Sequence, residues 1–262
     1  MNTPLVSVLI CSHNAEKFIE STLLSILNQT YKNIEVLVLD NASTDTTDNI
    51  LKQISKGDSR LTVLASKTNH GPYQGLNLLL DKAKGTYIAI NDHDDIWHKE
   101  KLQKQVAFLE EHNEYVGCGS AIINWYEKYN QTFYRSQPET ANVAWHTSLV
   151  FRNAGYRYDT SVKVATDFYF IKNILCKSAK LIQNFEEPFV FRRIFRDSNN
   201  LSGKWMKKVS LMEIVSLNIG LVDKLLLLNR YILPQEFVEW LVLRMYSGNI
   251  PNKYKDYFFQ IR

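Results

Sequence analysis

The stretch that decides the fold is Thr86-Tyr87-Ile88-Ala89-Ile90-Asn91-Asp92-His93-Asp94-Asp95-Ile96-Trp97. Its first half is a continuous apolar run, which predicts a buried strand, and its second half brings three carboxylates together. Carboxylates crowded at the end of a buried strand repel one another and lose solvation, so they are costly unless a cation lies beside them. Carboxylate oxygens are the ligands that Mg2+ and Mn2+ prefer. The stretch therefore predicts a divalent metal that carries a phosphate-rich ligand.

Apolar strands and amphipathic helices alternate on the N-terminal side of this stretch. The expected strands are 5–11, 34–40, 61–65 and 86–91, and the expected helices are 15–29, 45–54 and 71–84. Asn14 is placed as the N-cap of the first helix. Continuous apolar strands separated by helices predict an α/β fold with a parallel sheet covered on both faces. Ligands bind beyond the carboxyl ends of such strands, so polar clusters at 11–14, 40–45 and 92–95 are expected to meet at one edge.

The rest of the chain continues this pattern and then becomes helical. Strands are expected at 116–123, 145–151 and 181–191, helices at 99–113 and 167–178, and helical structure from 203 to about 245, followed by an aromatic segment at 254–259. No apolar run is long enough for a membrane span, and the first residues lack the basic region of a signal peptide. The three cysteines form no disulfide or zinc pattern, which favours a reducing, cytoplasmic location.

The net charge of +4 is carried by the last part of the chain. Residues 204–262 hold nine Lys and Arg against five Asp and Glu, so the first 203 residues are neutral. A neutral body with a basic, aromatic tail indicates an anionic surface as a neighbour, such as the inner face of the cytoplasmic membrane. Packing of the tail on the body, or on a second copy in a homodimer, is an equally open alternative.

Five motifs, met in order along the chain, resemble those of family 2 glycosyltransferases. They are the strand and turn at 6–14, the link at 29–35, the acidic element at 40–45, the Asn-x-Gly turn at 69–71 with Asn77, and the Asp-x-Asp motif at 92–94. The resemblance is dense over 5–110, weaker to about 203 and absent beyond. It implies the GT-A fold, with a mostly parallel central sheet flanked by helices and followed by a C-terminal helical tail.

The same resemblance implies that three successive segments of the chain have different roles. Residues 1–98 form the half that binds a nucleotide sugar, 99–203 form the acceptor-binding and catalytic half of the same domain, and 204–262 form the tail. The bacterial members that the motifs resemble assemble surface polysaccharides. A UDP-sugar donor and a glycan acceptor, carried on a polyprenyl diphosphate, are the partners expected from this likeness, and no nucleic acid is expected.

Nucleotide contacts are implied for residues at the ends of the first strands. Asp40 is expected to accept the imide N–H of a uracil-type base, a charge-assisted bond, although a loop carboxylate that caps the next helix is the structural alternative. Cys11, His13 and Asn14 are expected at the nucleotide, with His13 against the base; a packed surface histidine is the alternative. Asp45, by contrast, is placed as a structural N-cap.

The turn and the acidic motif complete the expected donor site. Asn69 and Gly71 fit a tight turn beside the nucleotide, because glycine permits close backbone approach. Asp94 is expected to bind Mn2+ or Mg2+, with Asp92 at the ribose or the metal and His93 at the nucleotide. The metal would neutralise the departing diphosphate. A solvated acidic turn is the structural alternative, and Asp95 is expected to cap the following helix through Lys99.

A base must remove the acceptor proton, and the resemblance places it at Asp167, with Asp159 as the second choice. A helix N-cap is the alternative role for Asp167. Trp145 and His146 are expected on a strand where an acceptor sugar would stack, although a core tryptophan is commoner. Arginines near the end of this region suit phosphate groups or plain solvation; they are Arg192, Arg193 and Arg196.

Some positions depart from the family pattern. Asn41 replaces its second acid, Ala42 its glycine and Leu76 a common arginine, while a common histidine near 192–202 is missing. The Gln-x-x-Arg-Trp element and the membrane helices of processive synthases are also missing, so addition of a single sugar is expected.

The predicted activity is a metal-dependent, inverting transfer of one hexose or N-acetylhexosamine from a UDP-sugar to a sugar hydroxyl in surface polysaccharide assembly. A nucleotide-sugar-binding scaffold and a nucleotidyltransferase are the alternatives. Sequence motifs do not name the sugar, the acceptor or the linkage, because single pocket contacts decide them.

Overall fold

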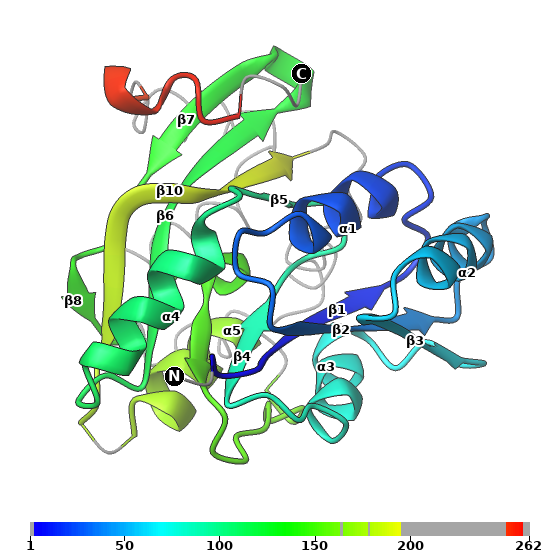
Figure 1. The fold of residues 1–262 in the computed structure, drawn as a ribbon, viewed down its shortest axis with the longest axis horizontal. Coiled ribbons are helices and arrows are strands. Elements are labelled where there is room, and N and C mark those ends of the chain that lie inside the picture. Colours follow the sequence, from blue (N-terminus) through cyan, green and yellow to red (C-terminus); the bar gives the residue numbers. More distant parts are fainter. Residues whose placement is uncertain (1–2, 163–164, 178, 195–249, 259–262) are drawn as a thin grey trace, which may run out of the picture.

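A ten-stranded mixed sheet organises the computed structural model, which describes residues 3–162, 165–177, 179–194 and 250–258. The strands are β1 (Val6–Ser12), β2 (Ile34–Asn41), β3 (Leu61–Ser66), β4 (Tyr87–Ile90), β5 (Ile96–Trp97), β6 (Gly117–Tyr126), β7 (Gln131–Arg135), β8 (Thr140–Ala141), β9 (Val150–Arg152) and β10 (Ile182–Ile194). The longer helices are α1 (Ile19–Leu27), α2 (Thr47–Gly57), α3 (Pro72–Leu80) and α4 (Lys101–Glu111), followed by the short α5 (Thr166–Tyr169). The main strand order is β3-β2-β1-β4-β9-β6-β10-β5 (Figure 1).

The N-terminal strands form the expected parallel half of the sheet. β1 lies between β2 and β4 and is parallel to both, and β3 extends the sheet beyond β2. In register, Ser12 of β1 lies beside Asp40 of β2, and β4 ends at Ile90, just before the acidic motif. The carboxyl ends of these strands therefore meet at one edge, as the sequence predicts.

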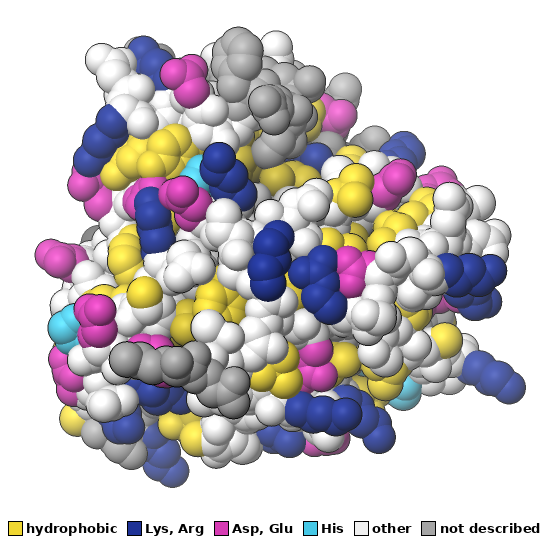
Figure 2. Space-filling view, viewed as in Figure 1, with side chains coloured by type: hydrophobic (Ala, Val, Ile, Leu, Met, Phe, Trp, Pro, Cys, Tyr) yellow, Lys and Arg dark blue, Asp and Glu magenta, His cyan; other side chains and the backbone are white. Residues whose placement is uncertain are grey.

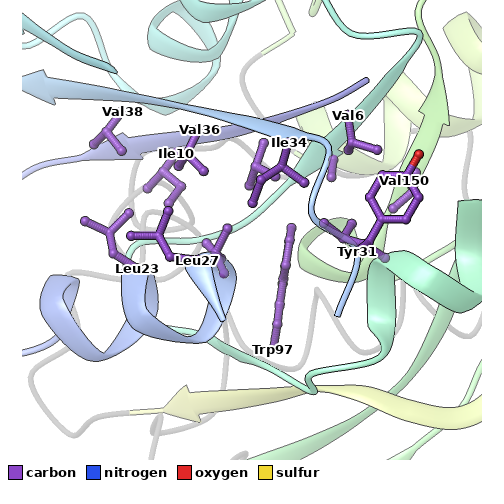
Figure 3. Packing of buried hydrophobic residues seen from close by; sticks show 14 of the residues in the cluster. Val6, Ile10, Leu23, Leu27, Tyr31, Ile34, Val36, Val38, Trp97 and Val150 are labelled. Carbon is purple, nitrogen blue, oxygen red and sulfur yellow. The ribbon is translucent and has the colours of Figure 1, made fainter. Parts of the chain in front are cut away.

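Alternate side chains of the strands fill two separate cores, one on each face of the sheet. On one face, α1, α2 and α4 cover Val6, Ile10, Val36 and Val38, with Trp97 packed among them (Figure 3). On the other face, α3 and the 166–175 helical segment cover side chains such as Leu9 and Ile88. Burial on both faces explains why these strands are continuously apolar.

The second half of the sheet is mixed, an arrangement that the apolar strand pattern did not predict. β9 is antiparallel to both β4 and β6, β6 and β10 are parallel, and the short β5 is antiparallel to β10. β7 pairs with β6 and β8 pairs with β10 at the margins. β5 follows directly after the acidic motif, so its pairing with β10 ties that motif to the end of β10.

Several predicted element boundaries are wrong in instructive ways. The first helix begins at Ile19, and Asn14 does not cap it: Asn14 has a φ of 50° and its Oδ1 accepts the backbone N–H of Thr44 at 2.8 Å. Asn14 thus ties the loop after β1 to the loop after β2. Trp145 and His146 do not lie on a strand, because residues 146–148 form a single 3₁₀ turn ahead of β9. Predicted helix 167–178 is a short α-turn followed by a π-helix at Phe170–Leu175.

The last described segment, residues 250–258, packs on the body of the protein near β7 and β10 (Figure 1). The Tyr257 ring stacks on His98 with centroids 4.5 Å apart, and Phe258 packs against Phe191 of β10 at 5.6 Å. Lys253 pairs with Glu186 at 3.1 Å. Residues 250–258 therefore follow the packing alternative. The helical structure predicted from 203 to about 245 lies outside the described residues, as does Arg196.

Basic and acidic side chains alternate over the surface of the described body. Figure 2 shows Lys and Arg interspersed with Asp and Glu on this face, in keeping with the balanced charge of the first 203 residues. Within the described ranges, none of the helices has both the length and the apolar character needed to cross a membrane.

Candidate active site

Four residues from three strand ends build a polar wall at the edge of the sheet. The Nδ2 group of Asn41 donates to Oδ1 of Asn69 at 3.1 Å and to the Gly71 carbonyl at 3.2 Å, and lies 3.5 Å from the Cys11 sulfur. Gly71 has a φ of 76°, which glycine adopts without strain. The structure therefore brings together Cys11, Asn69 and Gly71. Asn41, which replaces an acid in the family pattern, is hydrogen-bonded to both Asn69 and Gly71 of this turn.

Burial keeps the Cys11 thiol of this wall uncharged. Desolvation raises the pKa of the Cys11 thiol to about 12, and the nearby charges of Asp92 and Asp40 act in the same direction. Gly75 of α3 lies so close that a Cβ there would approach the Cys11 sulfur to 2.4 Å. Cys11 therefore serves as a neutral, packed contact and not as a nucleophile.

Asp40 and His13 flank the same edge. Asp40 is 5% exposed, and one of its oxygens accepts the Ser43 backbone N–H at 3.2 Å, so it also caps the following turn. His13 Nδ1 lies 3.1 Å from the Asn41 carbonyl oxygen. Asp45 accepts the N–H of Thr47 at 3.0 Å, a structural contact at the start of α2, but the N-cap of that helix is Thr46 and not Asp45 as predicted.

Hydrogen bonds, mainly to its backbone carbonyls, hold the acidic motif (92–95) in place. Arg193 at the end of β10 donates from its guanidinium to the Asp94 carbonyl oxygen and from its backbone N–H to Asp95 Oδ1, both at 3.2 Å. Thr22 of α1 donates to the His93 carbonyl oxygen at 3.0 Å. Asp95 is 1% exposed and does not cap a helix; α4 begins at Lys101 instead. The prediction that Asp95 caps the next helix through Lys99 is therefore wrong.

Burial and mutual repulsion destabilise the ionised form of this motif. Desolvation raises the pKa of Asp94, His93 opposes this shift and Asp92 adds to it. For Asp95, burial and then the charges of Asp94 and Asp92 raise the pKa well above the usual range. These are the shifts expected when carboxylates converge without enough positive charge.

Arg192 supplies part of the positive charge. Burial lowers the pKa of Arg192, but the charges of Asp95, Asp92, Asp94 and Asp167 more than reverse this, so the net direction is upward. This places Arg192 within the field of all four carboxylates. A role at a phosphate group stays a prediction for this half-buried arginine.

Asp167 belongs to the same cluster, although it lies on a distant segment of the chain. It is the second residue of α5, whose N-cap is Ala165, so Asp167 is not the N-cap. Its Oδ1 accepts the Phe168 N–H at 2.9 Å. Ala165 has a φ of 51°, a conformation that is strained for alanine and is often found near functional sites. The second choice, Asp159, accepts the N–H and hydroxyl of Ser161 in a turn.

Three rings lie between Asp167 and the acidic motif, and two of them were not predicted from the sequence. His146 Nε2 lies 2.7 Å from the Tyr158 hydroxyl, and His146 Nδ1 lies 4.0 Å from Oδ1 of Asp92. Tyr73 packs on both, with centroid separations of 5.4 Å to Tyr158 and 6.2 Å to His146. No pattern marks Tyr73 or Tyr158 in a chain with 14 tyrosines, so only the fold reveals them.

Trp145 lies beside this group. The guanidinium carbon of Arg135 lies 5.9 Å from the centre of the Trp145 ring. The Nε1 atom of Trp145 is buried without a hydrogen-bond partner among the described residues. The structure therefore places Trp145 at the margin of the site, in a short turn, and its contact with an acceptor stays a prediction.

The carboxylates fit a divalent cation that shares its coordination with a substrate. Asp92 and Asp94 have hard oxygen donors, and burial together with repulsion raises the pKa of Asp94, a penalty that a cation would relieve. In the parts of the chain that the structure describes, no three His, Cys, Asp or Glu side chains group as a metal site. One or two carboxylates plus substrate phosphates are a common way to hold Mg2+.

The glycine turn, the pair of carboxylates and the third carboxylate lie beyond the carboxyl ends of parallel strands, where open α/β proteins bind their ligands. Comparison with known proteins makes this specific. A model of glycosyl transferase family 2 matches residues 7–175, and the chain belongs to this family of enzymes.

Relatives and solved structures agree with this family. The chain is 31% identical over 183 residues to the Escherichia coli protein named UDP-Glc:alpha-D-GlcNAc-diphosphoundecaprenol beta-1,3-glucosyltransferase WfaP, covering 67% of this chain and 72% of that one. The first three curated relatives are matched over only 38%, 44% and 43% of their own lengths.

Two solved structures share the fold. S. aureus TarS 1-349 in complex with UDP-GlcNAc has a TM-score of 0.60 at 20% identity, covering 97% of this chain and 78% of that one. The Pyrobaculum calidifontis mannosyltransferase PcManGT in complex with GDP-Man and Mn2+ has a TM-score of 0.59 at 18% identity, covering 98% and 69%. The predicted GT-A fold with its mostly parallel central sheet is confirmed.

Proposed function

We propose that this protein is an inverting, metal-dependent glycosyltransferase that moves one hexose or N-acetylhexosamine from a UDP-sugar to a sugar hydroxyl. The observation that carries the proposal is the convergence of Asp92, Asp94 and Asp167, from two distant segments, beside the turn built by Asn41 and Gly71. A donor bound along that turn would present its diphosphate to the first pair and its sugar toward Asp167.

The reaction is a single displacement. Asp167 accepts the proton of the acceptor hydroxyl while that oxygen attacks the anomeric carbon, and the bond from that carbon to the diphosphate oxygen breaks with release of UDP. Attack from the face opposite the leaving group inverts the anomeric centre. Asp94 and Asp92 would hold the Mn2+ or Mg2+, which when bound neutralises charge on the diphosphate.

The donor side of the site is assigned to residues 1–98 and the acceptor side to residues 99–203. In this proposal Asp40 accepts the imide N–H of the base and His13 contacts its ring. The other residues proposed on the nucleotide side are Asn14, Cys11, Asn69, Gly71 and His93. The UDP and UDP-GlcNAc complexes of TarS support a uridine donor, and the Mn2+ complex of PcManGT supports a metal.

A lipid-diphosphate-linked glycan is the proposed acceptor. The WfaP and WfgD names, which specify GlcNAc-diphosphoundecaprenol, support this class of acceptor. Such an acceptor lies at a membrane, and the basic tail, residues 204–262, would favour peripheral contact with an anionic leaflet. Salt-sensitive co-sedimentation with anionic vesicles, lost when Lys204, Lys207 and Lys208 are changed to glutamate, tests that contact. An unchanged sedimentation would remove it.

The test of the reaction is Asp167→Asn, with Asp159→Asn as the matched control. We expect the first variant to lose transfer while its affinity for UDP stays that of the wild type, and the second to keep both. Screening UDP- and dTDP-sugars for nucleotide release, with and without Mn2+, identifies the donor. Full turnover in Asp167→Asn would refute the assigned base, and UDP binding without transfer by the wild type to any sugar acceptor would favour a binding protein.

A further inference from the structure

The 3₁₀ turn at 146–148 contacts the chain on both sides of the acidic motif through one residue, Thr147. The Thr147 hydroxyl donates to Oδ1 of Asn91, the residue before the motif, at 2.8 Å, and both residues are buried. The Thr147 carbonyl accepts the indole N–H of Trp97, two residues after the motif, at 3.2 Å. Thr147 is therefore hydrogen-bonded to both flanks of residues 92–95.

The turn itself is fixed to the rest of the sheet. Ser148 is fully buried; its Oγ accepts the backbone N–H of Ser120 on β6 at 3.1 Å, and its carbonyl accepts the side-chain N–H of Gln105 on α4 at 3.0 Å. The Leu149 carbonyl, next along the chain, accepts the N–H of Ile90 at the end of β4 at 3.2 Å. Fully satisfied buried polar networks are rigid, so the turn has a fixed position beside the acidic motif.

His146, the first residue of this turn, faces Asp92 with one of its ring nitrogens. His146 Nδ1 lies 4.0 Å from Asp92 Oδ1, and the other nitrogen, Nε2, lies 2.7 Å from the Tyr158 hydroxyl. The His146 side chain is 11% exposed, whereas the Asp92 side chain is 45% exposed. The imidazole is thus held in place, and the carboxylate has room to rotate.

Tyr158 fixes the orientation of the imidazole. Tyr158 is 3% exposed, its ring stacks on Phe170 with centroids 3.9 Å apart, and Asn77 bonds to both of its backbone groups. A phenol hydroxyl that donates to Nε2 of a neutral imidazole leaves the ring proton on Nδ1. In this tautomer the N–H group of His146 faces the Asp92 carboxylate.

We propose that His146 is a positioning residue for Asp92. Its Nδ1–H donates to one Asp92 oxygen once the carboxylate has rotated toward it, which leaves the other oxygen for the metal or the ribose. The rotation is needed because 4.0 Å is too long for a hydrogen bond. The inference rests on the function proposed for Asp92 and Asp94, and it differs from the acceptor contact predicted for His146. Loss of a group that orients a metal-binding side chain costs about 10- to 100-fold in metal affinity or activity.

The experiment measures Mn2+ binding, which a contact with the acceptor would leave unchanged. Free Mn2+ is followed by electron paramagnetic resonance as the full chain is added in the presence of saturating UDP. We expect His146→Leu to bind Mn2+ about 10-fold more weakly than the wild type. His146→Asn, whose amide can take the place of Nδ1, should recover most of the affinity. His112→Leu, which removes an imidazole paired with Glu114 at the end of α4, is the matched control and should equal the wild type.

The two variants of His146 distinguish positioning from a general effect on the fold. Both lose the contact with Tyr158, so they differ in the group that faces Asp92. Equally weak Mn2+ binding in His146→Leu and His146→Asn would therefore overturn the inference, and so would wild-type binding in His146→Leu.

Transfer kinetics give a second readout. In His146→Leu, transfer at limiting Mn2+ should fall about 10-fold, excess Mn2+ should restore most of it, and the acceptor KM should stay that of the wild type. A raised acceptor KM with wild-type Mn2+ affinity would contradict the inference and favour the acceptor contact.

Asp94→Asn separates the inference from the proposed function. If Mn2+ binding survives in Asp94→Asn, the metal role proposed for that carboxylate fails, and the comparison of His146→Leu with His146→Asn still decides the inference. If Asp94→Asn loses Mn2+ and His146→Leu keeps it, the proposed function stands and the inference fails. Absence of Mn2+ binding by the wild type would overturn both.

Discussion

Arg193 Nη1 lies 3.2 Å from the backbone oxygen of Asp94, and the hydrogen bond between them fastens the end of β10 to the acidic motif. The contact uses the Asp94 backbone and leaves its carboxylate to other partners. His146 Nδ1 approaches Asp92 only to 4.0 Å. The protein therefore fixes the course of this loop while keeping its two proposed metal-binding carboxylates available.

Asp94→Asn should separate function from stability. We expect transfer to fall about 100-fold or more, because stabilisation of the leaving diphosphate is lost. Metal-free stability should rise, because burial, and to a lesser degree Asp92, disfavours the ionised Asp94 in the folded state. Thermal melts with and without Mn2+ and UDP check this. The wild type should gain stability when Mn2+ and UDP are added together, and the variant should not. Asp48→Asn, at an exposed pair with Lys52, is the control.

The direction of the pH dependence follows from the same shift. A carboxyl whose pKa is higher in the folded than in the unfolded protein loses stability as pH rises from the unfolded toward the folded value. Relative to Asp94→Asn, the metal-free wild type should therefore lose stability across that interval. An identical pH dependence of the two proteins would contradict the shift.

Lys101 offers a second pH test, away from the site. It is fully buried, its Nζ donates to Gln105 Oε1 at 2.8 Å and lies 4.0 Å from the centre of the Trp97 ring, and desolvation lowers its pKa to about 7. The folded protein then binds fewer protons than the unfolded one between about pH 7 and the usual lysine value, so stability rises with pH there. Lys101→Met should remove this rise.

Urea unfolding of the wild type and Lys101→Met at pH 7 and pH 9.5 measures the difference. We expect the variant to be more stable by about 1–2 kcal/mol at the lower pH, since removing the buried ammonium outweighs leaving Gln105 with one partner fewer. The advantage should shrink or reverse at the higher pH. An equal difference at both values would show that Lys101 does not titrate in this range.

Ala42 carries strain that a glycine would relieve. Its φ of 63° lies in the left-handed region, at the position where the family pattern has glycine. Ala42→Gly should stabilise the fold by about 0.5–1 kcal/mol, because the relieved strain exceeds the added chain entropy. Ala65→Gly, in exposed β3 backbone of ordinary conformation, should destabilise by about the same amount. Chemical denaturation would show both; destabilisation by Ala42→Gly would contradict this account.

Phe258 joins the end of the chain to the body. It is 7% exposed and packs with Phe191 and Ile96, the residue that follows the acidic motif. Phe258→Ala should cost about 3 kcal/mol, and exposed Lys255→Ala less than about 0.5 kcal/mol. Denaturant midpoints measure both. Equal midpoints for the wild type and Phe258→Ala would mean that this segment does not pack on the body in solution.

The parallel half of the sheet could be predicted because its signals are local. Continuous apolar strands buried on both faces, such as β1 and β2, contrast sharply with the amphipathic helices between them. β9 and β5, with three and two residues, are too short to carry such a signal, and their antiparallel pairing depends on partners far along the chain. Asn14 looked like a helix cap, but its side chain instead bonds across to the next loop.

The convergence of the polar wall (Cys11, Asn41, Asn69 and Gly71) with the acidic motif could also be predicted in outline, since strand-end polar residues converge in any parallel sheet. The surroundings of Asp167 could not. Tyr73, Tyr158 and Arg192 lie within the electrostatic field of Asp167 from three separate segments, and a residue type alone does not reveal which groups lie near it. Asn77 matched a family motif, yet its observed partner is the Tyr158 backbone.

The most direct test of the account is anomalous diffraction at the manganese edge from crystals grown with UDP and Mn2+. We predict one peak that is bonded to an Asp94 oxygen and to the diphosphate, with Asp92 at the metal or the ribose. Nucleotide bound with no peak at this edge of the sheet, and with both carboxylates hydrogen-bonded to protein groups, would contradict the proposed role of the acidic motif.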